Sequence, residues 1–433
     1  MQNFQPLRQL NKTSGYGPGD VLVVFGEVFA RGYVNGLIDE AKACGMTIIY
    51  STVGRRDEND VLRPLNPAEL AGKDQPLINI PLECGFDLEK SSKGLTPCEQ
   101  VKGLKLSEAS RAVFDFSQVE ESRRKGRDSF RGRVKQFVVE LQKMIPKGSK
   151  VLMAHTMAGG VPRAKIILPV MNRVFKGQGE RFSSSQEFWE SPLGRLAAQS
   201  FLDVTANSFA DLIELTQPLR EQVKKAGGET SYVAFGYHGT EILIGGKYQW
   251  QSYAPYLQGF AKLELEQIAI RAGADGIKAC VFNAPEILTN SSSIFLGVEI
   301  ALYPLLGAFK KEGGNHPFTR KLEDECRALL KPEHSLEEIM RLTDEYLLSD
   351  IILKRWSDYS LWPQHNGPEQ MELMCNTSAR ILSMHRDERQ LLVATLSEIV
   401  FRACGKAMFY EGLTPRHNVC WIGHDLVAKL SLA

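Results

Sequence analysis

Three side chains between residues 253 and 262 have the types and spacing needed for acid–base chemistry beside a sheet. Eight residues separate Tyr253 from Lys262, and five separate Tyr256 from it. A tyrosine hydroxyl can donate to a developing oxyanion and deliver a proton, and a nearby ammonium lowers the pKa of that hydroxyl. The pattern favours Tyr253 as the donor, with Tyr256 as the competitor and Tyr237 as a helper on the substrate side.

A glycine-containing turn follows the first strand-like run of the chain. Gly26, Ala30 and Gly32 stand between the apolar run 20–25 and a helical pattern over 33–44. Dinucleotide binding needs a tight turn, close approach of the backbone to the pyrophosphate and an open helix N-terminus. The spacing therefore predicts a dinucleotide site, and the alternative is a turn that only packs the helix on the sheet.

Two arginines follow the second expected strand and bear on which dinucleotide binds. The end of this strand meets the adenosine ribose, where an acidic residue binds a 2′-hydroxyl and an arginine binds a 2′-phosphate. Arg55 and Arg56 therefore favour NADPH, and NADH is the alternative because Asp57 follows closely. Gly159, after the fourth expected strand, is assigned to the same cofactor site.

The elements that must position these residues alternate between strands and helices. This alternation predicts an α/β fold with a doubly wound parallel sheet. The expected strands are 20–25, 46–53, 77–82, 150–154, 231–235 and 276–282, and the main expected helices are 33–44, 119–145 and 257–272.

The remainder of the chain is expected to be helical. We divide it into a sheet domain over 1–355, with an irregular and helical insertion at about 85–147, and a helical C-terminal extension over 356–433 packed on that domain. No strand is expected after Glu299. Helices are expected at 322–330, 335–348, 369–382 and 387–402.

The composition is that of an ordinary globular protein. The 433 residues carry 52 Lys and Arg against 51 Asp and Glu, which argues against nucleic-acid binding through bulk charge. No apolar run reaches the roughly 18 residues of a membrane span. The eight cysteines are scattered, which favours reduced thiols in the cytoplasm, and no cluster has the spacing of a metal site.

The segment 232–294 resembles the enoyl-thioester reductases of the short-chain dehydrogenase superfamily. Its Tyr-x8-Lys spacing is that of the FabV and trans-2-enoyl-CoA reductase class, and Gly259-Phe-Ala-Lys262 matches the helix that carries the lysine in the FabI class. Ala284-Pro285-Glu-Ile-Leu-Thr289 resembles the A-G-P-I-x-T stretch after the sixth strand. The whole chain also resembles a group of long reductases described as FabMG-like.

This resemblance implies a Rossmann-type fold and NAD(P)H-dependent reduction of the trans-2 double bond of an enoyl thioester in fatty acid synthesis. The acyl group would be carried by acyl carrier protein or coenzyme A, and the enzyme would be a homo-oligomer. Lys262 would bind the nicotinamide ribose, and the turn with Pro285, Leu288 and Thr289 would bind the carboxamide of the nicotinamide.

Departures from the resemblance keep alternatives open. Gly236 stands where short-chain dehydrogenases place a catalytic serine, which argues against the alternative of a carbonyl reductase. Ala30 replaces a glycine of the turn, which keeps open a dinucleotide-binding protein without turnover. The basic run 123–135 is interpreted as a solvated helix face or as a docking patch for an acidic carrier protein.

Overall fold

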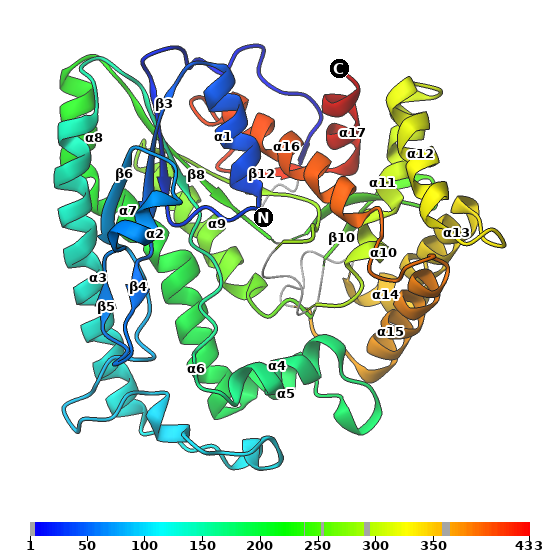
Figure 1. Cartoon of the computed structure of the whole chain (residues 1–433), viewed down its shortest axis with the longest axis horizontal. Helices are drawn as coiled ribbons and strands as arrows, with labels where there is room; N and C mark the ends of the chain where they lie inside the picture. Colours follow the sequence, from blue (N-terminus) through cyan, green and yellow to red (C-terminus); the bar gives the residue numbers. More distant parts are fainter. Residues whose placement is uncertain (1–4, 238, 253–254, 290–294, 357–363) are drawn as a thin grey trace.

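The centre of the molecule is one parallel sheet of eight strands (Figure 1). The computed structural model describes residues 5–237, 239–252, 255–289, 295–356 and 364–433. The sheet order is β1-β12-β11-β8-β7-β2-β3-β6. Strands after β2 are first added on one side of it, as β3 and β6, and then on the other side, from β7 onward, so the order of strand addition reverses between β2 and β7. The strands are β1 (Pro6–Leu7), β2 (Val21–Phe25), β3 (Thr47–Thr52), β6 (Leu77–Pro81), β7 (Val151–His155), β8 (Thr230–Phe235), β11 (Lys278–Asn283) and β12 (Val419–Ile422).

Apolar β-branched residues form these strands because both faces of the sheet are covered. All five residues of β2 are buried. Val21, Val23 and Phe25 belong to the core on one face, and Leu22 and Val24 belong to the core on the other. The expected doubly wound sheet is confirmed.

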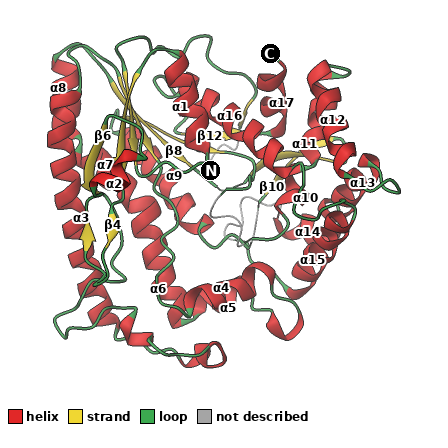
Figure 2. Ribbon diagram, in the orientation of Figure 1, coloured by secondary structure: helices red, strands yellow, loops and turns green. Residues whose placement is uncertain are grey.

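Helices cover both faces (Figure 2). One face packs against α1 (Tyr33–Ala43), α16 (Val393–Glu411) and α17 (His424–Leu432). The other packs against α3 (Phe116–Met144), α7 (Ser208–Leu215), α8 (Gln217–Lys225) and α9 (Gly259–Ala274). The remaining helices are α2 (Pro67–Ala71), α4 (Ile167–Lys176), α5 (Ser185–Glu190), α6 (Pro192–Phe201), α10 (Val298–Leu302), α11 (Pro304–Gly313), α12 (Pro317–Leu329), α13 (Leu336–Leu347), α14 (Asp350–Trp356) and α15 (Pro368–Ser383). No helix among the described residues is long and apolar enough to cross a membrane.

Helices α1 and α16 cross in backbone contact (Figure 1). A Cβ placed on Gly36 would lie 2.1 Å from the Phe401 carbonyl oxygen. A Cβ on Gly405 would lie 2.0 Å from the carbonyl carbon of Gly36. Both positions therefore require glycine, and this contact fixes where α1 lies relative to the C-terminal part of the chain.

The basic run on α3 contacts carboxylates of the next helical layer. Arg123 binds Asp203 at 2.7 Å, in the π-helix η4 (Leu202–Asn207) that joins α6 to α7. Arg127 lies 3.2 Å from Asp211 of α7, and Arg131 binds the same carboxylate. These arginines hold α3 against η4 and α7. The sequence had suggested a solvated helix face or a docking patch for the basic run, and neither interpretation included these internal ion pairs.

Strands outside the six expected ones were missed. β12 lies inside the main sheet between β1 and β11, so residues 356–433 contribute a strand to the sheet as well as helices. The antiparallel pair β9 (Thr240–Ile244) and β10 (Lys247–Gln251) turns at Gly245 and Gly246, both with positive φ. A Gly-Gly pair between a β-branched run and a run with two aromatic residues is a hairpin signal that the sequence contained.

The segments before and after α2 and between β6 and α3 are mostly irregular. They contain the short antiparallel pair β4 (Arg55–Arg56) and β5 (Leu62–Arg63), and the 3₁₀ turns η1 (Glu99–Val101) and η2 (Leu106–Arg111). A third 3₁₀ turn, η3 (Gly179–Arg181), joins α4 to α5.

Candidate active site

The turn after β2 is tight and leads into a helix whose N-terminus has no side-chain cap. Gly26 has φ +122°, and a Cβ there would lie 2.3 Å from Thr156 Oγ1, so no other residue fits. Gly32 is the N-cap of α1 and supplies no side chain, so the first N–H groups of the helix are not capped by it. An uncapped N-terminus suits a pyrophosphate, and Ala30 lies exposed in the loop before it.

Gly159 lies across the point where the sheet order reverses. It follows β7, the neighbour of β2, and has φ +96°. The Thr205 hydroxyl of η4 donates to the Gly159 carbonyl oxygen at 3.4 Å. Gly26 and Gly159 therefore flank the crevice in which ligands of doubly wound sheets bind.

The two arginines after β3 are already bound to carboxylates. Arg55 forms a two-pronged pair with Glu27, with nitrogen–oxygen distances of 2.8 and 2.9 Å, and Lys73 lies 2.6 Å from the same carboxylate. Burial alone would raise the pKa of Glu27, but the hydrogen bonds from Arg55 and Lys73 lower it to about 2. Arg56 binds Glu83 at 2.6 Å.

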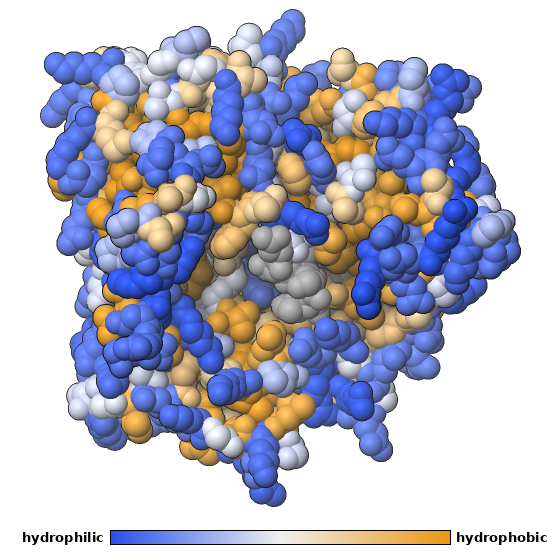
Figure 3. Space-filling model, in the orientation of Figure 1, coloured by the Kyte–Doolittle hydropathy of each residue, from blue (hydrophilic) through white to orange (hydrophobic). Residues whose placement is uncertain are grey.

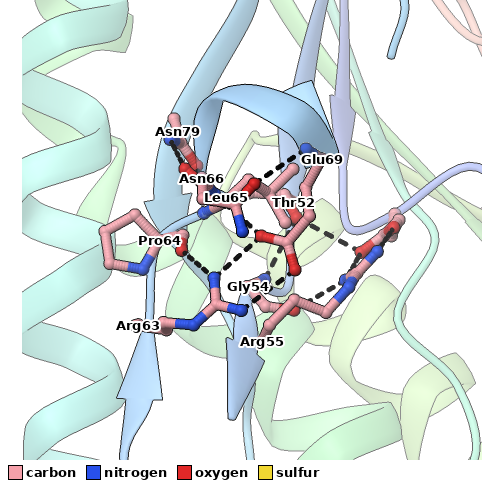
Figure 4. Close-up of polar contacts among 10 residues, drawn as sticks. Thr52, Gly54, Arg55, Arg63, Pro64, Leu65, Asn66, Glu69 and Asn79 are labelled. Carbon is pink, nitrogen blue, oxygen red and sulfur yellow. Dashed lines mark hydrogen bonds and ion pairs between the residues drawn. The ribbon is translucent and has the colours of Figure 1, made fainter. Parts of the chain in front are cut away.

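Figure 4 shows the surroundings of Arg55. Thr52 and Gly54 lie next to it, and Thr52 also donates to Glu27 at 3.2 Å. A second pair, Arg63 with Glu69 at 2.7 Å, lies beside the first. The arginine that the sequence assigns to a 2′-phosphate is therefore held by the protein's own carboxylate.

Lys262 is a buried cation at the carboxyl edge of the sheet. It lies in the first turn of α9 and is 5% exposed. Its ammonium donates to the carbonyl oxygen of Phe235, the last residue of β8. Burial lowers the pKa of Lys262 to about 8.

Two tyrosines pack together near the end of β8 and the start of α9. Tyr237 follows β8 by two residues, and its ring packs edge-on against Tyr256 with centroids 4.4 Å apart. Phe295 also packs against Tyr256, with ring centroids 5.4 Å apart. Burial, followed by the negative charge of Glu286, raises the pKa of Tyr256, so its hydroxyl keeps its proton. Tyr253 lies outside the described residues.

Gly236 has no room for a side chain. A Cβ there would lie 2.3 Å from Asn283 Oδ1. Asn283 is fixed because its amide donates to Glu266 at 2.7 Å, and both residues are fully buried. The position at which a ketoreductase would carry its serine is therefore closed by Asn283.

The turn after β11 is tied to the start of α1, next to the turn after β2. The Tyr33 hydroxyl, from the first residue of α1, donates to the Pro285 carbonyl oxygen at 2.6 Å. The Leu288 amide donates to Ser397 Oγ at 2.9 Å, and Thr289 follows it. Tyr33 also stacks on Phe235 at 5.7 Å. Tyr33 was not predicted as a site residue, because an aromatic residue at a helix start is no specific signal.

Glu286 was also missed, although it stands inside the turn already assigned to the cofactor. It lines a cavity of about 40 Å³ together with Tyr237, Pro285 and Tyr346. The Tyr237 hydroxyl bonds to its carboxyl group, but burial outweighs this bond and raises the pKa of Glu286 to about 8. Figure 3 shows apolar side chains around a hollow in the middle of this face of the molecule.

Comparisons with known proteins agree with this geometry. A family model described as enoyl-acyl carrier protein reductase FabMG matches residues 3–431. The apo structure of a FabMG, described as a novel type of enoyl-acyl carrier protein reductase, is 43% identical with a TM-score of 0.95, covering 99% of this chain and 98% of its own. An NADH-bound FabMG structure is 38% identical with a TM-score of 0.78, covering all of both chains. No curated protein matched the sequence.

The match extends over nearly the whole chain, so it includes the insertions and the C-terminal helices that the motifs alone did not cover. It confirms the resemblance to enoyl-thioester reductases drawn from residues 232–294. The chain therefore belongs to the FabMG family of enoyl-acyl carrier protein reductases, enzymes that use NAD(P)H to reduce enoyl thioesters in fatty acid synthesis.

Proposed function

We propose that the crevice at the carboxyl edge of β2, β7, β8 and β11 is where this chain reduces the trans-2 double bond of an enoyl thioester. One observation carries the proposal: the buried ammonium of Lys262 is held at the end of β8, and Tyr237, two residues after that strand, packs against Tyr256. The dinucleotide, when bound, supplies a hydride to the β-carbon of the substrate.

The chain's own residues would stabilise the enolate that results. A neutral tyrosine hydroxyl donates to the enolate oxygen, and Tyr237 provides a proton for the α-carbon. Lys262 grips the nicotinamide ribose, and the backbone of the turn with Pro285, Leu288 and Thr289 holds the carboxamide. The uncapped N-terminus of α1 and the tight turn at Gly26 fit the pyrophosphate.

Removal of the donor hydroxyl tests this proposal directly. Tyr253 remains the first candidate because of its eight-residue spacing from Lys262, and the ring contact with Tyr237 supports Tyr256 as the alternative. We expect Tyr253→Phe to lower kcat by about 10²-fold and Tyr256→Phe by less than about tenfold. The measurement is dinucleotide oxidation with a trans-2-enoyl thioester. The reverse ranking would assign the role to Tyr256, and full activity in both variants would contradict the proposal.

For the cofactor, the arginine pattern predicts NADPH, whereas two observations support NADH. Arg55 and Lys73 both bind Glu27, so a 2′-phosphate would compete with a buried carboxylate for them. A relative that is 38% identical binds NADH. We therefore propose that NADH is used more efficiently than NADPH.

Glu27→Gln tests the cofactor proposal by releasing Arg55 and Lys73. We expect kcat/KM for NADPH to rise about tenfold, because two cations become available to a 2′-phosphate, while kcat/KM for NADH changes only a few-fold. Glu69→Gln is the matched control, since it breaks the neighbouring pair with Arg63. A wild-type preference for NADPH would contradict the proposal.

The proposal also includes the acyl carrier, the oligomeric state and the cellular compartment. We propose that acyl carrier protein, rather than coenzyme A, presents the substrate, since the family is described by that carrier. A homo-oligomer in the cytoplasm remains the expectation from the resemblance and from the scattered cysteines, all eight of which are free thiols.

A further inference from the structure

Glu286 is an acid placed among tyrosines. Its carboxyl group bonds to the Tyr237 hydroxyl, and its ionised form would raise the pKa of Tyr33, Tyr256 and Tyr346. The four tyrosines come from α1, the turn after β8, the segment before α9, and α13. This arrangement places one carboxyl group against the pair of rings that we assign to the substrate.

The surroundings of Glu286 favour its neutral form. The charged group acting on it is Glu299 of α10, a like charge, and no lysine or arginine of the described residues acts on it. Glu286 is half-buried, and a carboxyl group that is desolvated without a cation favours its protonated form. The 40 Å³ cavity that it lines has room for water, which gives the carboxyl group a proton source.

We propose that Glu286 resupplies the proton that Tyr237 gives to the substrate, as a positioning and relay residue that acts through Tyr237. The proposal rests on the proposed function of this site. In the step, the Tyr237 O–H bond breaks and a C–H bond forms at the α-carbon of the enolate. The carboxyl O–H bond of Glu286 then breaks and re-forms the Tyr237 hydroxyl. Water finally reprotonates the Glu286 carboxylate, so the net proton comes from solvent.

The pH dependence follows from the protonation of Glu286. Below a pKa of about 8 the acid is protonated and the relay works, and above it the relay is progressively lost. Lys262 loses its proton in the same range, so the pH profile of the wild type alone cannot separate the two groups. The ratio of wild-type to variant kcat separates them, because both enzymes contain Lys262.

Glu286→Gln is the test variant, since it keeps the shape of the side chain and removes the acid. At saturating dinucleotide we expect the ratio of wild-type to Glu286→Gln kcat to be about 10² at pH 7 and to fall about tenfold per pH unit above pH 8. Equal melting temperatures would show that the variant folds. A structural role would give a ratio that does not change with pH.

Glu299→Gln is the matched control. It removes the neighbouring buried carboxyl group, which does not line the cavity. Because only its charge effect on Glu286 is lost, we expect the kcat ratio to stay within a few-fold of one at pH 7 and to show no tenfold change per pH unit above pH 8. A pH-independent ratio for Glu286→Gln, or a ratio of one at pH 7, would overturn the relay while leaving the reductase intact. A wild-type chain without turnover would overturn the proposed function and the relay together.

Discussion

Lys262→Met lowers kcat/KM by about 10³-fold and leaves the chain folded. The wild-type ammonium is buried and bound to the Phe235 carbonyl oxygen, at the carboxyl edge where we place the nicotinamide ribose. Methionine fills a similar volume but cannot donate a hydrogen bond or carry a charge. Loss of both the ribose contact and the positive field beside the tyrosines should remove about 4 kcal/mol of transition-state stabilisation. The measurement is steady-state oxidation of NADH and NADPH.

The stability of the same variant shows whether Lys262 is present for function. Since burial lowers the pKa of Lys262 to about 8, the unfolded state holds this proton more tightly than the folded state. The wild type should therefore gain stability as pH rises from about 8 towards 10.4, by up to about 3 kcal/mol, and Lys262→Met should lack this gain. Lys224→Met, on the exposed end of α8, is the control with unchanged activity. Activity of Lys262→Met within a few-fold of wild type would rule out its role.

The sheet could be predicted because its strands are buried on both faces. Each of the six expected strands is an apolar run bounded by turn residues, and such runs leave a clear signal. β12 was missed because it is four residues long and follows a long series of helical patterns. It becomes a strand through pairing with β11, a tertiary contact that local pattern does not record.

The residue types that form the site could be predicted from the sequence. Which side chains bind one another was harder to predict. Lys262 and the Pro285 turn lie at the expected edge because their positions follow from strand ends. Arg55 was assigned to a phosphate since nothing in the sequence shows that Glu27, 28 positions earlier, binds it. Tyr33 belongs to no recognisable motif, and Glu286 stands inside the Ala284–Thr289 stretch without a role assigned by it. The partners of both residues became visible only when distant segments were brought together.

Gly405→Ala should destabilise the protein by about 3 kcal/mol and also weaken its dinucleotide binding. The added Cβ would lie 2.0 Å from the carbonyl carbon of Gly36 and 2.2 Å from the Leu37 nitrogen, which are backbone atoms that cannot rotate away. Helix α1 must then move away from α16, and overpacking of this kind costs about 1–3 kcal/mol or more. Because we place the pyrophosphate at the N-terminus of α1, we expect the Kd for NADH to rise about tenfold.

A glycine-to-alanine substitution should raise the free energy of unfolding where the added methyl group has space. Such a substitution is therefore a strict control for Gly405→Ala. A Cβ on Gly132, in the middle of α3, meets no atom within 4 Å, so Gly132→Ala should stabilise the protein by about 0.5–1 kcal/mol through helix propensity. Melting temperatures and NADH titrations of the two variants measure both effects. If Gly405→Ala melted at or above the wild-type temperature, α1 and α16 could not be in backbone contact. If it melted lower but bound NADH normally, the position of α1 would not determine the cofactor site.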